Sequence, residues 1–163
     1  EENNLAESET EKLNELKTEM DNWYREIISA ENLRVLPNVV GTPFENPVRL
    51  SRHELVRGYA RGWFSRHYVG HYVMDVRKEG DYQIKITFRD AITEPGKVEM
   101  KFGPVGRELQ VENVPATEVV FEDVLLPAGQ HVLQTLYQNG KDVISPFYVE
   151  IENKQKGFLY EDE

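Results

Sequence analysis

Apolar side chains near the beginning of the chain recur at the spacing of an α-helix. Five of them follow one another at steps of three or four positions: Leu13, Leu16, Met20, Trp23 and Ile27. This period places all five side chains on one stripe of a helix. Ser8 and Glu11 have the spacing of a capping box at the start of that helix. The pattern predicts an N-terminal amphipathic helix, with Leu13, Leu16, Met20 and Trp23 as the candidate residues for docking on another domain.

A different pattern begins at about Val69, where apolar and polar residues alternate along short segments. The clearest alternation runs from Tyr82 to Phe88, and similar segments lie at 72–77, 98–102, 109–111, 119–124, 130–137 and 145–152. Turn residues separate these segments, including the pair Asn139-Gly140 that is typical of a tight hairpin. Seven or eight short strands joined in this way are typical of a sandwich, so we expect a mainly β fold, an antiparallel β-sandwich preceded by the helix.

The segment between the helix and these strands is rich in residues that interrupt helices. Pro37, Gly41, Pro43 and Pro47 all fall within it, so any structure there is made of short extended pieces. The expected organisation has four parts, namely the helix at 1–30, a linker and loop segment at 31–66, the β-sandwich at 67–153 and a polar tail at 154–163.

Composition narrows the classes of partner. The chain has 163 residues, a formal net charge of −10 and no cysteine. The length suits one domain, or one domain with an attached helix. The negative charge argues against nucleic acid, because no basic surplus exists to neutralise phosphates, and a sulfated glycan would need a local basic patch. Without cysteine there is no disulfide and no thiol nucleophile. No apolar run reaches the length of a membrane span.

The N-terminal segment resembles the late part of the type I sulfatases. Residues 2–6, Glu-Asn-Asn-Leu-Ala, are followed by the helical segment from Lys12 to Trp23. In that family a loop of the pattern DPxExNNLA leads into a helix of the pattern KLxELKxxxDxW near the end of the catalytic region. The Asp-Pro half of the loop is missing here. The resemblance implies that residues 1–30 belong to the end of a sulfatase or arylsulfatase catalytic region, and that the chain is a C-terminal fragment.

The strand-rich part has a resemblance of its own. Residues 72–84 and residues 126–133, Leu-Pro-Ala-Gly-Gln-His-Val-Leu, are similar to jelly-roll β-sandwich modules of the galactose-binding or carbohydrate-binding type. Tyr72 stands where such modules often have tryptophan. Several Bacteroidetes-type sulfatases carry a sandwich of this kind after the catalytic domain. The resemblance therefore implies a jelly-roll or galactose-binding-like accessory domain.

The motif that forms a sulfatase active site does not occur in the sequence. That motif is C/S-x-P/A-x-R, in which the cysteine or serine becomes formylglycine, and neither Ser65 nor Ser145 begins it. We therefore expect no catalytic residue and no cofactor in this chain. The resemblance implies that the parent protein hydrolyses sulfate esters, with formylglycine and calcium, and that it is periplasmic or secreted.

The histidines give no clear metal site. His53 and Glu54 begin the zinc-protease motif H-E-x-x-H, but Arg57 stands where the second histidine belongs. His67 and His71 are four residues apart, yet the chain there is becoming a strand, in which this spacing separates the two side chains. We expect no metal ligand among them.

Residues 49–67 form the one stretch that is both basic and aromatic. Arginine forks suit sulfate and carboxylate groups, and aromatic faces suit sugar rings. Five residues of this stretch are therefore candidate substrate contacts: Arg57, Arg61, Trp63, Arg66 and His67. In the alternative interpretation the arginines pair with acidic groups of the protein, which is the common role of charged residues, and Trp63 packs in the core.

The function that these observations favour is a non-catalytic C-terminal domain of a sulfatase, which completes the fold of the catalytic domain and shapes one wall of its substrate cleft. The first alternative is a stand-alone carbohydrate-binding module. Its candidate aromatic contacts are Trp63, Tyr68 and Tyr72, although strand alternation places Tyr72 in the core. The second alternative is an independent enzyme, for which no carboxylate pair, triad or phosphate loop is recognisable. The expected partners are the missing catalytic domain and a sulfated glycan.

Overall fold

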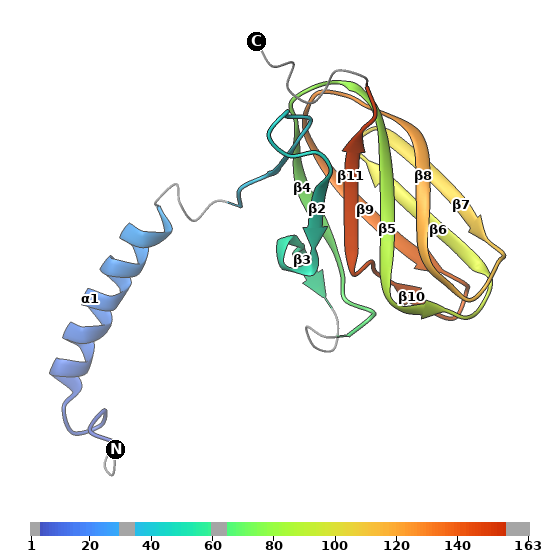
Figure 1. Ribbon diagram of the computed structural model, residues 1–163. Helices are drawn as coiled ribbons and strands as arrows, with labels where there is room; N and C mark the ends of the chain where they lie inside the picture. The colour runs from blue at the N-terminus through green and yellow to red at the C-terminus, as the bar shows by residue number, and fades with distance from the viewer. Residues whose placement is uncertain (1–3, 30–34, 60–64, 156–163) are drawn as a thin grey trace. The chain divides into compact units, whose positions relative to one another are not determined.

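The computed structural model describes residues 4–29, 35–59 and 65–155, and the side chains of residues 57–59 are outside this description. The chain divides into two compact units, Glu1–Val35 and Leu36–Glu163. The first unit holds one α-helix and the second holds the strands (Figure 1). Each unit is described below by itself.

The predicted helix is present as α1, Thr10–Ile28. The predicted capping box at its start is wrong. The N-cap residue is Glu9, and no side chain caps the helix there. Instead, the Ser8 hydroxyl donates to the Leu5 carbonyl at 3.2 Å, and the backbone N–H groups of Ser8 and Glu9 donate to the same oxygen at 3.2 and 2.9 Å. A turn that closes on Leu5 thus occupies the hydroxyl that would have capped α1.

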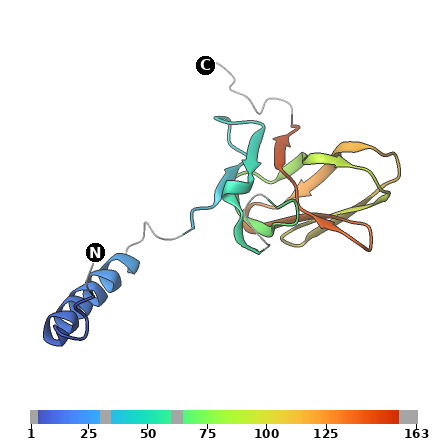
Figure 2. The same ribbon diagram turned by 90° about the horizontal axis from the view of Figure 1, so that it is seen from below.

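The second unit is a β-sandwich, which confirms the predicted fold class (Figures 1 and 2). One sheet has the order β1 (Asn38–Val40), β4 (Val69–Val76), β9 (Gly129–Gln138), β6 (Gly96–Phe102) and β7 (Val105–Val111), with β3 (Val56–Tyr59) beside β4 and β10 (Val143–Ile144) beside β9. The other has the order β2 (Val48–Ser51), β11 (Tyr148–Asn153), β5 (Gly80–Ile92) and β8 (Ala116–Leu126). A short 3-10 helix, η2 (Arg52–Glu54), follows β2.

The alternating apolar residues form the core between the two sheets. In β5 the side chains of Tyr82, Ile84, Ile86 and Phe88 are all buried, while the intervening residues are more exposed, as the sequence pattern predicts. The facing sheet supplies further fully buried side chains: Tyr72, Met74, Val98, Met100, Phe102, Leu133 and Tyr137. Burying these apolar surfaces is the dominant stabilising contribution to a fold of this kind.

Most strand pairs are antiparallel, but β1 and β4 pair in parallel, with Asn38 opposite Met74. After β1 the chain crosses to the other sheet through residues 41–47. Gly41 has a φ of +77°, and a Cβ atom at this position would collide with the Tyr82 hydroxyl. Glycine is therefore required for this crossing, because it adopts the left-handed backbone conformation and leaves room for the tyrosine.

The Tyr72 side chain carries a polar group into the core. Its ring is 1% exposed, and its hydroxyl has no hydrogen-bond partner within the described part of the chain. Burial, reinforced by the charge of Glu54, raises the pKa of Tyr72 above its ordinary value. The phenol therefore stays neutral in the folded state at pH values where the unfolded chain would ionise.

Replacing Tyr72 with phenylalanine is expected to raise the free energy of unfolding at neutral pH by about 1 kcal/mol, because a buried hydroxyl without a partner costs desolvation energy. Since the folded pKa of Tyr72 lies above the unfolded pKa of about 10, the ionisation of Tyr72 leaves the free energy of unfolding unchanged below pH 10 and lowers it as the pH rises towards the folded pKa. Urea unfolding at pH 7 and in the alkaline range checks both points. An unchanged alkaline loss of stability in Tyr72→Phe would contradict the assignment.

Candidate functional site

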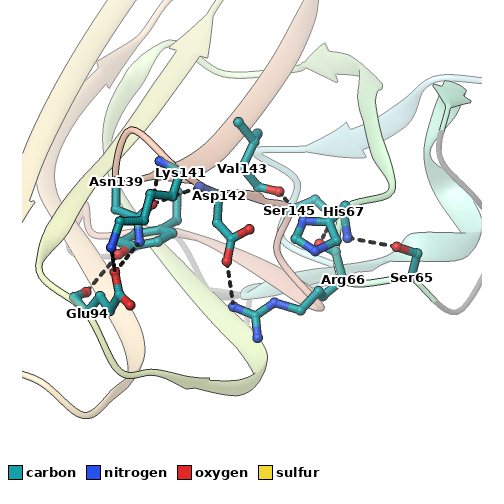
Figure 3. A network of polar contacts seen from close by, with 10 residues as sticks. Ser65, Arg66, His67, Glu94, Asn139, Lys141, Asp142, Val143 and Ser145 are labelled. Carbon is teal, nitrogen blue, oxygen red and sulfur yellow. Dashed lines mark hydrogen bonds and ion pairs between the residues drawn. The ribbon is translucent and has the colours of Figure 1, made fainter.

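A small polar pocket lies at one end of the sandwich, where three connecting segments come together (Figure 3). These segments are the turn between β5 and β6, the turn between β9 and β10, and the residues that precede β4. The pocket has a volume of about 110 Å³ and is lined by Arg66, Ile92, Thr93, Glu94, Tyr137, Asn139, Asp142 and Ile144. Loops held by a rigid scaffold are a common location for binding residues.

The turn between β9 and β10 is fixed by its own hydrogen bonds. The Asn139 side-chain oxygen accepts from the backbone N–H groups of Lys141 and Asp142, at 3.0 and 2.8 Å. Gly140 has a φ of +82°, which this tight turn requires. The Asn139 amide nitrogen donates to the Glu94 carboxylate at 3.3 Å. These bonds hold Asp142 and Glu94, both of which line the pocket, in defined positions.

The other strand connections hold the pocket in the same way. The Tyr137 hydroxyl donates to the backbone carbonyl of Glu94 at 2.7 Å, which ties the β5–β6 turn to β9. The His67 ring nitrogen Nδ1 lies 2.8 Å from the Val143 carbonyl, and the Ser145 N–H donates to the Arg66 carbonyl at 3.1 Å. The segment that carries Arg66 is thus bonded along the length of β10.

The buried side chain of Arg52 holds the segment that carries Arg66 in place. Its side chain is only 5% exposed, and its guanidinium donates to three acceptors: Ser65 O at 2.6 Å, Ser145 Oγ at 3.3 Å and Pro146 O at 3.3 Å. Desolvation lowers the pKa of Arg52 from its ordinary value, but arginine remains charged at any physiological pH. Arg52 therefore links η2, the segment before β4 and the residues that lead into β11.

The charges in the pocket are only loosely paired. Arg66 Nη2 and Asp142 Oδ2 are 3.9 Å apart, and Lys141 Nζ and Glu94 Oε2 are 3.6 Å apart. Both separations exceed the usual length of a hydrogen bond. In addition, Arg66 Nε is buried without a hydrogen-bond partner in the described structure. Donors and acceptors of the pocket can therefore form further hydrogen bonds to another molecule.

The structure accounts differently for the five candidate substrate contacts. Arg61 and Trp63 lie outside the described residues, and Arg57 is described only as part of the backbone of β3. Arg66 lines the polar pocket, whereas the ring of His67 contacts the Val143 carbonyl. The substrate role of these five residues stays a prediction.

Sequence reasoning did not find the other residues of the pocket. Glu94 and Asp142 belong to the turns that the sequence marks at Glu94-Pro95-Gly96 and Asn139-Gly140, so the turn positions were recognisable although their meeting was not. Elsewhere in the basic stretch, the Arg49 guanidinium lies 3.8 Å from the centre of the Tyr148 ring, a cation–π contact within the sandwich. Arg49 and Arg52 therefore contact groups of this chain, but these groups are a ring, two carbonyls and a hydroxyl rather than the acidic partners of the alternative interpretation.

The helical unit presents a second surface. No described residue of α1 is buried, and Leu16, Met20 and Trp23 are 52%, 58% and 61% exposed. Leu13 is half-buried, and together with Leu5, Ala6 and Leu16 it lines a shallow, mainly apolar groove of about 350 Å³ at the start of the helix. The four candidate docking residues thus lie on one apolar face of α1, which we call the helix stripe.

Within the described residues, no group of three or more histidine, aspartate or glutamate side chains is placed to hold a metal ion. No helix in the same residues is long and apolar enough to cross a membrane.

No known protein family matches the chain, and no curated protein sequence matches it either.

Proposed function

We propose that this chain is a non-catalytic C-terminal region of a sulfatase, in which the helix stripe docks on the catalytic domain and the β-sandwich forms a structural appendage. The observation that carries the proposal is the exposure of Leu16, Met20 and Trp23 on a helix without buried residues. The family resemblance of residues 2–6 and of the helix that follows supports the choice of partner.

The physical argument starts from the stability of the helix. An isolated helix of this length is marginal in water, and most helical stability in proteins comes from packing an apolar face against another surface. Exposed apolar faces of this kind mark interaction sites. The sandwich has its own continuous core, formed without any residue of α1. We assign a catalytic domain of the sulfatase type as the partner of the helix stripe, because α1 resembles the last helix of such a domain.

In this arrangement the sandwich shapes one wall of the substrate cleft. The parent protein would hydrolyse sulfate esters, on glycans as the resemblance implies, with formylglycine and calcium held by its catalytic domain. It would act in the periplasm or outside the cell. Arg57 and Arg61 of the basic stretch are the residues that we propose face a sulfated substrate, whereas Arg66 belongs to the polar pocket with Glu94 and Asp142.

Without its partner, the chain is expected to self-associate through the helix stripe. Replacing Leu16 and Trp23 together with glutamate should make the chain monomeric, because two charges on the stripe prevent apolar contact. Sedimentation velocity over a wide range of protein concentrations provides the measurement.

The matched control places the same two charges on the opposite face of α1, with Thr18→Glu and Asn22→Glu, both exposed positions. This control should self-associate like the original chain. The docking role of the stripe would be contradicted by an original chain that is monomeric and whose α1 amides are protected from hydrogen exchange, because the stripe would then pack on its own sandwich.

A second candidate function is carbohydrate binding by the sandwich, which the polar pocket beside Arg66 favours. It predicts that the isolated chain binds glycans without a catalytic domain. Calorimetry against sulfated and unsulfated glycans tests this function, and saturable binding that survives moderate salt would support it. If none of these glycans binds, the docking role remains as the proposed function.

A further inference from the structure

We propose that the pocket between Arg66, Glu94 and Asp142 binds a neutral sugar through adjacent hydroxyl groups. The inference rests on the second candidate function and gives it a site and a class of ligand. It is independent of the helix stripe, so that either proposal can fail without the other.

The hydrogen-bonding capacity of the pocket matches hydroxyl groups. Arg66 offers donors only, and its Nη2 group is separated from Asp142 Oδ2 by 3.9 Å. The carboxylates of Asp142 and Glu94 offer acceptors only. A hydroxyl group is a donor and an acceptor at once. Two neighbouring hydroxyls of a sugar can therefore accept from Arg66 and donate to the carboxylates, which neither a carboxylate nor an ammonium ligand can do.

The charges of the pocket favour an uncharged ligand. The charged residues that line the pocket are one positive group, Arg66, and two negative groups, Glu94 and Asp142, whereas Lys141 lies outside the lining. An anion such as sulfate would gain from the guanidinium but would be repelled by both carboxylates, and a cation would meet the reverse situation. A neutral polyol is not repelled by either kind of charge, and the hydrogen bonds that it makes to charged groups are among the stronger ones.

The size of the pocket limits how much of a sugar can enter. A volume of about 110 Å³ holds a few water molecules, each of which occupies about 30 Å³ in the liquid. One edge of a single ring therefore fits, and the rest of the sugar remains in solvent. The apolar part of the lining consists of Ile92, Ile144 and the Tyr137 ring. With so little surface buried, we expect dissociation constants on the order of millimolar.

The test is a titration of the nitrogen-labelled chain, followed by proton–nitrogen correlation NMR, with methyl galactoside, methyl glucoside and methyl mannoside up to about 50 mM, well above a millimolar Kd. At least one sugar should shift the amide signals of residues 92–94 and 139–144 in a saturable way. Asp142→Asn and Arg66→Gln should each weaken binding about tenfold, the effect of losing one charge-assisted hydrogen bond. Two variants are used so that a folding defect in one leaves the other informative.

The matched control is Arg77→Gln, which removes the same charge from an exposed arginine paired with the half-buried Asp75, at 2.9 Å between Arg77 Nη2 and Asp75 Oδ2, and should bind as the original chain does. Sodium sulfate is the anion control and should leave the pocket amides unshifted. The inference is overturned if none of the three sugars shifts these amides saturably, if both pocket variants bind normally, or if sulfate produces the same shifts. Self-association through α1 would be unaffected by any of these outcomes.

Discussion

Replacing Arg52 with alanine is expected to lower the free energy of unfolding of the sandwich by about 3–5 kcal/mol. The buried guanidinium donates to the Ser65 and Pro146 carbonyls and to the Ser145 hydroxyl, and all three acceptors lose a charged donor together. The truncation also leaves a cavity next to the Phe147 ring, which lies 5.9 Å from the guanidinium carbon. Urea unfolding followed by circular dichroism measures the change.

Two further variants separate the role of Arg52 from a general effect of charge. Arg52→Lys keeps the positive charge but cannot reproduce the planar fork of the guanidinium. It should therefore lower the free energy of unfolding measurably, but by less than Arg52→Ala does. Arg77→Ala removes an exposed arginine that is paired with the half-buried Asp75, and should lower stability by about 1 kcal/mol, well below the loss for Arg52→Ala. An Arg52→Ala sandwich as stable as Arg77→Ala would show that Arg52 is not the anchor that we describe.

A second large effect is expected from Phe102→Ala, which should lower the free energy of unfolding by about 3–5 kcal/mol. Phe102 is fully buried at the end of β6, and its ring centre lies 5.8 Å from that of His131 in β9. Its loss removes a large apolar contact and opens a cavity that the paired strands β6 and β9 cannot easily close. The same urea experiment measures it.

The control for this second prediction is Phe44→Ala. Phe44 is the same residue type in the same unit but is 80% exposed, so its replacement should cost less than about 1 kcal/mol. Similar losses for Phe44→Ala and Phe102→Ala would contradict the assignment of Phe102 to the core. Retention of native stability by Phe102→Ala would contradict it as well.

The parts of the fold that local patterns specify were predictable. The alternation from Tyr82 to Phe88 faces the core as expected, because a strand that packs on one face must bury every second side chain. Asn139 and Gly140 begin the turn between β9 and β10 as expected, but the loop runs from 139 to 142, and of these two residues only Gly140 takes a positive φ. The parallel pairing of β1 with β4 was not predictable, because short extended segments carry no signal for the strand beside them.

The two capping-box patterns show why a motif alone is insufficient. Ser8 and Glu11 have the pattern without the structure, whereas Ser51 and Glu54, with the same spacing, form a complete capping box at η2. Ser51 ends a strand in an extended conformation, so its hydroxyl can accept from the N–H groups that follow it. The Glu54 carboxylate in turn accepts from the Ser51 N–H at 2.8 Å. The backbone that precedes the motif decides between the two outcomes.

The candidate site was predictable only in part. Arg66 was recognisable as a basic residue in a basic stretch, but its partners come from turns about 30 and 75 residues further along the chain, which only the sheet order brings together. The buried role of Arg52 was not predictable from the sequence, because arginine is rarely buried and its acceptors at Ser145 and Pro146 are 93 and 94 residues away. Contacts of this range depend on the completed sandwich.

The sulfatase proposal is tested most directly by sequencing the mature native polypeptide that contains these residues. An antibody raised against the sandwich, residues 36–163, would isolate this polypeptide, and mass spectrometry would read its peptides. The proposal predicts that a C/S-x-P/A-x-R segment lies N-terminal to Glu1 in the same polypeptide, with its cysteine or serine converted to formylglycine. A mature polypeptide whose sequence contains no such segment would contradict it.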